Sequence, residues 1–199
     1  MFVVGVTGGI GSGKTAATNR FAEHSITVVD ADLASRVIVE PGRKAIQAIE
    51  AHFGSEVISA DGTLDRRALR NIVFNDPNER KWLEQLTHPL IAEEILHQLR
   101  TSSSAYTILA SPLLLESSQH KMAHRILVID VPEALQISRT IARDETSEEG
   151  VKAIIAAQMS RQERLAMADD VVTNDQSLEF LHKAIDQLHL QYLAIAEAK

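Results

Sequence analysis

The chain has 199 residues, which fits one α/β domain with room for a small insertion. Its 45% hydrophobic and 24% charged residues exclude a disordered, collagen-like or coiled-coil chain. It has no cysteine, which excludes disulfides, thiolate metal sites and cysteine nucleophiles. A formal net charge of −7 argues against a general nucleic-acid binder, so we expect no nucleic-acid partner.

The sequence shows no signal for export or for insertion into a membrane. No basic region stands ahead of an apolar run in Met1–Gly5, and no apolar stretch approaches the length of about 20 residues that spans a bilayer. We therefore expect a cytoplasmic protein without a membrane partner. The oligomeric state stays open, with a monomer favoured over a coiled-coil dimer.

The first predicted elements are a strand, a glycine-rich loop and a helix. Residues 2–7 are mostly β-branched or aromatic, and the glycine cluster after them leads into a helix over 14–23. A second buried strand is predicted over 26–30, and it ends in a carboxylate. We expect this strand to pair in parallel with the first.

Helical spacing then continues to about residue 100, and no strand signal interrupts it. Gly54 is predicted to cap the C-terminus of one helix in this segment. His88 precedes Pro89, so we expect an extended backbone there. Its imidazole ring then either points into an acceptor groove or has a structural role.

Strand patterns return after the helical segment. Strands are predicted over 106–110, 126–131 and 170–173, and a long terminal helix over 177–198 is expected to cover the sheet. The charged residues 144–150 have no apolar anchor, so we interpret them as a loop that can move as a lid.

One segment carries the pattern of a phosphate-binding loop. It reads Gly8-Gly9-Ile10-Gly11-Ser12-Gly13-Lys14-Thr15, with a predicted strand before it and a helix after it, as the motif requires. The glycines let backbone N–H groups turn onto phosphate oxygens, while Lys14 offers a positive charge and Thr15 a hydroxyl ligand for magnesium. A flexible glycine turn is the alternative, and the flanking elements disfavour it.

Small-molecule kinases, GTPase switches and transport ATPases all share this loop. The sequence has neither the Asp-x-x-Gly nor the Asn-Lys-x-Asp segment of a GTPase. Pro132-Glu133 follows the strand over 126–131, where a transport ATPase has an acidic pair. We therefore interpret the chain as a kinase, in which a helical insert and a lid shield phosphoryl transfer from water.

These features predict an α/β fold of the P-loop NTPase type, in three layers with a parallel central sheet. We assign residues 1–31, 105–136 and 165–199 to the nucleotide-binding core. Residues 32–104 are assigned to a helical acceptor-binding insert, and residues 137–164 to the lid.

Two carboxylates follow the second predicted strand, at the position where ligands of open α/β sheets bind. A carboxylate there can orient an acceptor hydroxyl, accept its proton or hold magnesium through water. We choose Asp32 as the catalytic residue. The alternative role is an N-cap on the next helix, which suits Asp30 better than Asp32.

Arg139 and Arg143 lie four residues apart, on one face of a predicted helix, and can reach the transferring phosphoryl group. Arg161 and Arg164 form a second pair. For each arginine the alternative is a solvated position that pairs with nearby acidic residues. We rank Arg143 first and Arg139 second.

Several segments, in their order and spacing, resemble the dephospho-coenzyme A kinase family over nearly the whole chain. They are the phosphate loop from Val6 onward, Asp30-Ala31-Asp32 with Arg36, Pro41-Gly42, Phe53-Gly54, Asp61-Gly62-Thr63-Leu64-Asp65-Arg66, Leu86-Thr87-His88-Pro89, Pro112-Leu113-Leu114-Leu115-Glu116, Arg143-Asp144, Gln158, and Ala168-Asp169 leading to Asn174. Thr15 and Leu115 depart from the residues common there, but they keep the hydroxyl and the apolar character.

The resemblance implies ATP as donor, the ribose 3′-hydroxyl of dephospho-coenzyme A as acceptor, and Mg²⁺ as cofactor. It implies ATP-binding roles for Gly8, Gly9, Gly11, Ser12, Gly13, Lys14, Thr15, Ala16 and, beside the adenine, Asn174. It implies acceptor-binding roles for Asp32, Arg36, His88 and Leu114, and catalytic roles for Asp32, Lys14, Arg143 and Arg139. A kinase for another nucleotide or small hydroxyl acceptor, and a non-catalytic ATP-binding regulatory protein, stay open as alternatives.

Overall fold

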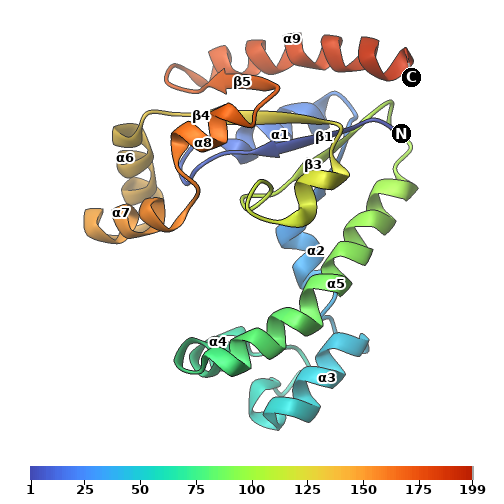
Figure 1. Cartoon of the computed structure of the whole chain (residues 1–199), viewed down its shortest axis with the longest axis vertical. Coiled ribbons are helices and arrows are strands. Elements are labelled where there is room, and N and C mark those ends of the chain that lie inside the picture. Colours follow the sequence, from blue (N-terminus) through green and yellow to red (C-terminus); the bar gives the residue numbers. More distant parts are fainter. Residues whose placement is uncertain (199) are drawn as a thin grey trace. The chain divides into compact units, whose positions relative to one another are not determined.

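The computed structural model describes residues 1–198 and contains a five-stranded sheet with the strand order β2-β3-β1-β4-β5 (Figure 1). The strands are β1 (Val3–Thr7), β2 (Thr27–Asp30), β3 (Thr107–Ala110), β4 (Arg125–Asp130) and β5 (Asp170–Thr173). Strand β1 pairs in parallel with β3 and β4, and β4 pairs in parallel with β5. The predicted α/β fold with a parallel central sheet is therefore confirmed.

One predicted strand pairing is wrong, because β3 lies between β1 and β2. Every residue of β3 is buried, whereas only Val29 of β2 is fully buried. A strand buried along its whole length belongs inside a sheet, and a half-buried strand belongs at its edge. The chain therefore leaves the sheet after β2 and returns to place β3 beside β1.

The chain divides into two compact units, the first formed by Met1–Val29 and the chain from Leu99 onward, the second by Asp30–Gln98. The first unit holds nearly all of the sheet together with α1 (Lys14–Glu23), α6 (Glu133–Asp144), α7 (Glu148–Ala157), α8 (Arg161–Ala166), α9 (Leu178–Glu197) and the short helix η2 (Ser118–Met122). The second holds α2 (Ala31–Val37), α3 (Lys44–Phe53), η1 (Ser55–Val57), α4 (Arg66–Asn75) and most of α5 (Pro77–Thr101). No helix within residues 1–198 is long and apolar enough to cross a membrane.

The predicted lid over 137–164 contains most of α6, all of α7 and the first four residues of α8. The charged segment over 144–150 is less of a loop than predicted, because α6 reaches Asp144 and α7 begins at Glu148. The Ser147 hydroxyl caps α7 by accepting the backbone N–H of Gly150. A side-chain cap thus starts a helix within a segment whose composition suggested a loop. The lid role itself stays a prediction.

Four buried aromatic rings hold α1 and α9 against the sheet. Phe21 on α1 and Tyr192 on α9 are stacked, with ring centroids 6.1 Å apart. Tyr106, just before β3, is edge-on to both, and Phe2 completes the group. Each such aromatic pair adds about 0.5–1.5 kcal/mol beyond the burial of its area. Helix α9 therefore covers the sheet, as predicted and as Figure 1 shows.

The second unit has a separate hydrophobic core, to which α3, η1, α4 and α5 contribute. Its buried members are Ile38, Val39, Ala45, Ile49, Val57 and Leu69. Gly54 ends α3 with φ at 91°, a backbone conformation that side chains disfavour, so the predicted C-terminal cap is confirmed. Separate cores of this kind let two parts of one chain stay structurally independent.

The predicted extended backbone at His88 is wrong, because α5 continues through Pro89. A proline inside a helix costs about 3 kcal/mol. Apolar side chains on both sides of it pack on the second core, among them Leu86, Leu90 and Ile91. Full burial of one such side chain is worth about 1.5–3 kcal/mol, and these three are partly buried, so their combined packing offsets the local preference.

We expect Tyr192→Phe to lower the free energy of unfolding by about 1–2 kcal/mol at pH 7, because the Tyr192 hydroxyl donates to the Asp170 carboxylate over 2.8 Å. Burial raises the pKa of Asp170, but the hydrogen bonds from Arg125 and Tyr192 outweigh it and leave that pKa below its ordinary value. A depressed carboxyl pKa stabilises the fold above the ordinary pKa of 3.8, and this stabilisation is lost as the pH falls through the folded value. Denaturant unfolding of both proteins should therefore show a smaller difference at pH 3, and a difference independent of pH would contradict this assignment.

Candidate active site

The phosphate-binding loop lies between the end of β1 and the start of α1, as predicted. Gly13 precedes α1 with φ at 89°, and no side chain caps this helix. The first turn of α1 contains no acidic residue. The first N–H groups of the helix therefore have no side-chain partner, and the positive end of the helix dipole adds to their attraction for an anion.

The loop glycines are required by what lies directly behind them. A Cβ on Gly8 would lie 2.5 Å from the carbonyl oxygen of Ile129. A Cβ on Gly9 would overlap the Gln136 amide, and one on Gly13 would overlap the Asn174 amide. A Cβ at Gly8 would clash with the backbone, and one at Gly9 or Gly13 would displace an amide that is hydrogen-bonded to the loop. The glycines therefore let the supporting groups approach the loop backbone closely.

Side-chain amides hold the loop from behind. The Gln158 side chain accepts the N–H of Ile10 over 3.2 Å, and the Gln136 side chain donates to the Ile10 carbonyl over 3.0 Å. The buried Asn174 side chain donates to the Ser12 carbonyl over 2.8 Å. These bonds come from α6, from the residue after α7 and from the residue after β5, so three distant parts of the sequence fix one loop.

Two hydroxyls at the loop are buried, and within the described chain they have no hydrogen-bond partner. They belong to Ser12 in the loop and to Thr140 on α6 beside Gly11. Burying a hydroxyl without a partner costs about 1–3 kcal/mol. An oxyanion seated on the loop is the kind of group that can pair with such a hydroxyl, so this part of the site fits a phosphate.

Lys14 and Thr15 begin α1 at the mouth of the loop. Within residues 1–198, neither the Lys14 ammonium nor the Thr15 hydroxyl has a hydrogen-bond or ion-pair partner. The described residues contain no group of three or more histidine or acidic side chains that would hold a metal alone. This donor set fits Mg²⁺, which prefers few protein ligands together with waters and nucleotide phosphates.

The structure separates the two carboxylates that follow β2. Asp30 is the N-cap of α2, because its side chain accepts the N–H groups of Asp32 and Leu33. The capping alternative is thus confirmed for Asp30. The Asp32 side chain is exposed, and its carboxylate has no partner within the described residues. Asp32 keeps a chemically free carboxylate.

The arginines of α6 and α8 differ in what they contact. Arg139 donates to the backbone carbonyl of Asn174 over 2.9 Å. Arg143 is exposed and makes two hydrogen bonds to the adjacent Asp144, which raise its pKa. Arg161 makes two hydrogen bonds to the buried Asp130. Only Arg139 of these three contacts a residue that supports the loop.

The predicted acceptor residues are spread over different environments. Arg36 and His88 are exposed on α2 and α5. Leu114 is fully buried, and a Cβ on Gly5 would lie 2.6 Å from its side chain. Leu114 therefore packs against Gly5 of β1. Arg36 and His88 are exposed on the surface of the second unit.

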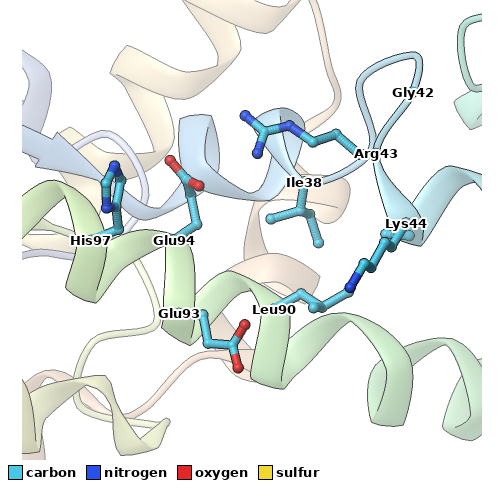
Figure 2. A pocket seen from close by; sticks show the side chains of 9 residues that line it. Ile38, Gly42, Arg43, Lys44, Leu90, Glu93, Glu94 and His97 are labelled. Carbon is cyan, nitrogen blue, oxygen red and sulfur yellow. The ribbon is translucent and has the colours of Figure 1, made fainter.

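The second unit contains a cavity of about 430 Å³ between α5 and the segment that leads from α2 into α3. Figure 2 shows Arg43 and Lys44 on one side of it, and Glu93 and His97 on α5 across from them. None of Asp32, Arg36 and His88 lines it. Sequence reasoning did not single out this cavity, because its polar residues come from elements 50 residues apart with no shared motif.

Of the residues that lie behind the loop, sequence reasoning assigned a role to Asn174 but none to Gln136, Thr140 or Gln158. Gln158 stands in the family pattern, and its spacing was the one available signal for it. Gln136 and Thr140 are polar residues of the helix that carries Arg139 and Arg143, yet both are buried. Only the packing of α6 behind the loop distinguishes these two residues from the exposed polar residues of the same helix.

A family model described as dephospho-CoA kinase matches residues 2–179. A dephospho-CoA kinase of Idiomarina loihiensis is 53% identical over 198 residues, which cover 100% of this chain and 98% of that protein. One of Escherichia coli K12 is 47% identical and covers 98% and 95%. A crystal structure from Thermus thermophilus matches with a TM-score of 0.82 at 30% identity, covering 96% and 97%.

We expect Gly13→Ala to destabilise the protein more than Gly62→Ala, although both glycines have similar positive φ values of 89° and 81°. A side chain in this conformation costs about 1–2 kcal/mol. A Cβ on Gly62 meets no atom within 4 Å, whereas one on Gly13 displaces Asn174 and so breaks its bond to the Ser12 carbonyl.

Denaturant unfolding and calorimetric titration with ATP measure the two effects separately. Only Gly13→Ala should weaken ATP binding, by about tenfold or more, equivalent to about 1.4 kcal/mol. Equal losses of stability in the two variants, with unchanged ATP affinity, would refute the supporting role of Asn174.

Proposed function

Because this chain belongs to the dephospho-CoA kinase family, we propose that it transfers the γ-phosphoryl group of ATP to the ribose 3′-hydroxyl of dephospho-coenzyme A. The observation that carries the proposal is a complete phosphate-binding loop in a chain that matches the family from residue 2 to residue 179. In this reaction the bond from the γ-phosphorus to its bridging oxygen breaks, and a bond to the 3′-oxygen forms. ADP leaves, and the hydroxyl proton passes to a base or to water.

The loop residues would act on the donor. The transition state of phosphoryl transfer is loose, so catalysis consists mainly of positioning and of stabilising negative charge. The backbone N–H groups of the loop orient the phosphates, and the unpartnered Lys14 ammonium neutralises charge on the β- and γ-phosphates. Mg²⁺, held by the Thr15 hydroxyl and the nucleotide, would supply further positive charge to the phosphates.

Asp32 would act on the acceptor, together with Arg36, His88 and Leu114 as its predicted neighbours. The support for Asp32 is its exposed carboxylate, which no helix cap engages. Because the proton leaves the acceptor late, such a base works mainly by orienting the hydroxyl. Asp30, by contrast, is committed to α2.

Arg143 and Arg139 would complete the site from the lid. Arg143 lies on α6 with 62% of its side chain exposed, so its pairing with Asp144 can be exchanged for a phosphate at small cost. Arg139 is tied to the Asn174 carbonyl, which suits a role at the nucleoside side of ATP.

The function is tested by measuring Mg²⁺-dependent release of ADP from ATP, with and without dephospho-coenzyme A. We expect turnover that depends on this acceptor and that Lys14→Ala abolishes while the melting temperature stays near that of the parent. Turnover with adenosine or another hydroxyl compound, but not with dephospho-coenzyme A, would indicate a kinase of different acceptor specificity. Absence of turnover in a protein that binds ATP would indicate a regulatory ATP-binding protein.

We expect Asp32→Asn to lower kcat by about 10²–10⁴-fold, the range for loss of a general base. Asparagine keeps the size and one hydrogen-bonding oxygen, so the affinities for both substrates and the melting temperature should change little. Asp30→Asn is the matched control, because asparagine is an equally good N-cap and should leave kcat nearly unchanged. Steady-state kinetics decide the point: a kcat of Asp32→Asn within about threefold of the parent removes Asp32 from the catalytic step, since tenfold corresponds to about 1.36 kcal/mol.

A further inference from the structure

The second arginine pair of the sequence analysis includes a buried arginine that borders the phosphate-binding loop and to which no role has been assigned. Arg164 on α8 has 8% of its surface exposed. Its guanidinium donates to the Met159 carbonyl over 2.7 Å. Within the described residues, no carboxylate lies within ion-pair distance of it, whereas Arg143 and Arg161 each have one. A buried charge without a counterion is costly, and proteins retain such groups where a ligand supplies the opposite charge.

The Arg164 guanidinium lies next to the phosphate-binding loop. A Cβ on Gly9 would lie 3.0 Å from its Nη1 atom, so the charged group borders the second residue of the loop. Arg164 also lines a cavity of about 240 Å³, together with Gln136 and Gln158. These are the two amides that hold Ile10. The same two side chains therefore line the cavity and support the loop.

The two carboxylates that act electrostatically on Arg164, those of Asp130 and Glu116, are hydrogen-bonded to other donors. Both oxygens of Asp130 accept from Arg161, and one oxygen of Glu116 accepts the backbone N–H of Met159. Burial lowers the pKa of Arg164, and these two carboxylates oppose the effect only at a distance. An arginine stays protonated even so, and the site keeps a positive charge that its own residues do not neutralise.

We propose that Arg164 is a further catalytic residue, whose guanidinium binds the transferring phosphoryl group of ATP. This rests on the proposed kinase function. The guanidinium has more N–H donors than its one described bond uses, and their planar fork matches the oxygens of a phosphoryl group. Because the group is already desolvated and fixed, its hydrogen bonds to the developing charge are stronger than those of an exposed lid arginine.

The test uses Arg164→Lys, which keeps the charge but removes the fork, and Gln162→Ala as the control on an exposed position of the same short helix. Calorimetry measures the affinity for ATP and for ADP, and steady-state kinetics measure kcat. We expect kcat to fall about 10²–10³-fold. The affinity for ATP should fall by about tenfold while that for ADP stays unchanged. The control should alter none of these values.

Equal loss of affinity for ATP and ADP would overturn the proposal, because a residue that merely supports the loop affects both nucleotides alike. An unchanged kcat would overturn it too. If Arg164→Lys does not fold, a crystal structure of the parent enzyme with ADP, aluminium fluoride and dephospho-coenzyme A decides the point. A guanidinium nitrogen within about 2.7–3.1 Å of a fluoride supports the proposal, and one beyond about 4 Å refutes it. The binding measurements do not need the acceptor, so they stay informative if the parent enzyme shows no turnover with dephospho-coenzyme A.

Discussion

The hydrogen bond from the Asn174 side chain to the Ser12 carbonyl meets a requirement on which the arrangement of the first unit depends. A phosphate-binding loop must keep its N–H groups available for the ligand, so its carbonyls have to be satisfied from behind. Asn174 does this at the Ser12 carbonyl and Gln136 at the Ile10 carbonyl. Gln158 instead accepts the N–H of Ile10, so that one N–H group is held by the protein itself. Asn174 can approach the loop only because Gly13 has no side chain and adopts a left-handed backbone conformation. A Cβ at position 13 would occupy the space that the Asn174 amide fills.

This constraint explains why distant elements converge on β1. Asn174 follows β5, and its backbone N–H also donates to the Asp130 carbonyl at the end of β4. Strand order therefore determines which residues can reach the loop. The aromatic packing of Tyr192 and Phe21 holds α9 on the same sheet, and the Tyr192 hydroxyl donates to Asp170 at the start of β5. Loop geometry thus depends on packing across the whole unit, although the ligand would contact only the loop.

The sequence predicted the loop, the strands around it and the terminal helix, because each has a strong local signal. Glycines at fixed spacing, buried β-branched runs and a periodic apolar stripe all act within a few residues. Two errors came from long-range effects. The position of β3 beside β1 reflects relative burial across the sheet, and the continuity of α5 through Pro89 reflects apolar packing on both sides of the proline. Asp30 as a cap was within reach of sequence reasoning, since a carboxylate at the start of a helix is a local pattern.

The arginines mark the limit of such reasoning. Arg143, Arg161 and Arg164 look equivalent in the sequence, since each stands near acidic residues on a predicted helix. Their environments differ in the fold: the first two are exposed and paired with a carboxylate, and the third is buried with a carbonyl as its partner. The exposed pair of Arg143 with Asp144 contributes little to stability and is easily exchanged, whereas Arg161 is held by the buried carboxylate of Asp130. Arg164, a buried cation without a carboxylate partner, exerts its full electrostatic effect on an anion that reaches it. The chemistry available to a guanidinium at this site is thus decided by burial, and burial follows from how α8 packs beside a loop formed about 150 residues earlier in the chain.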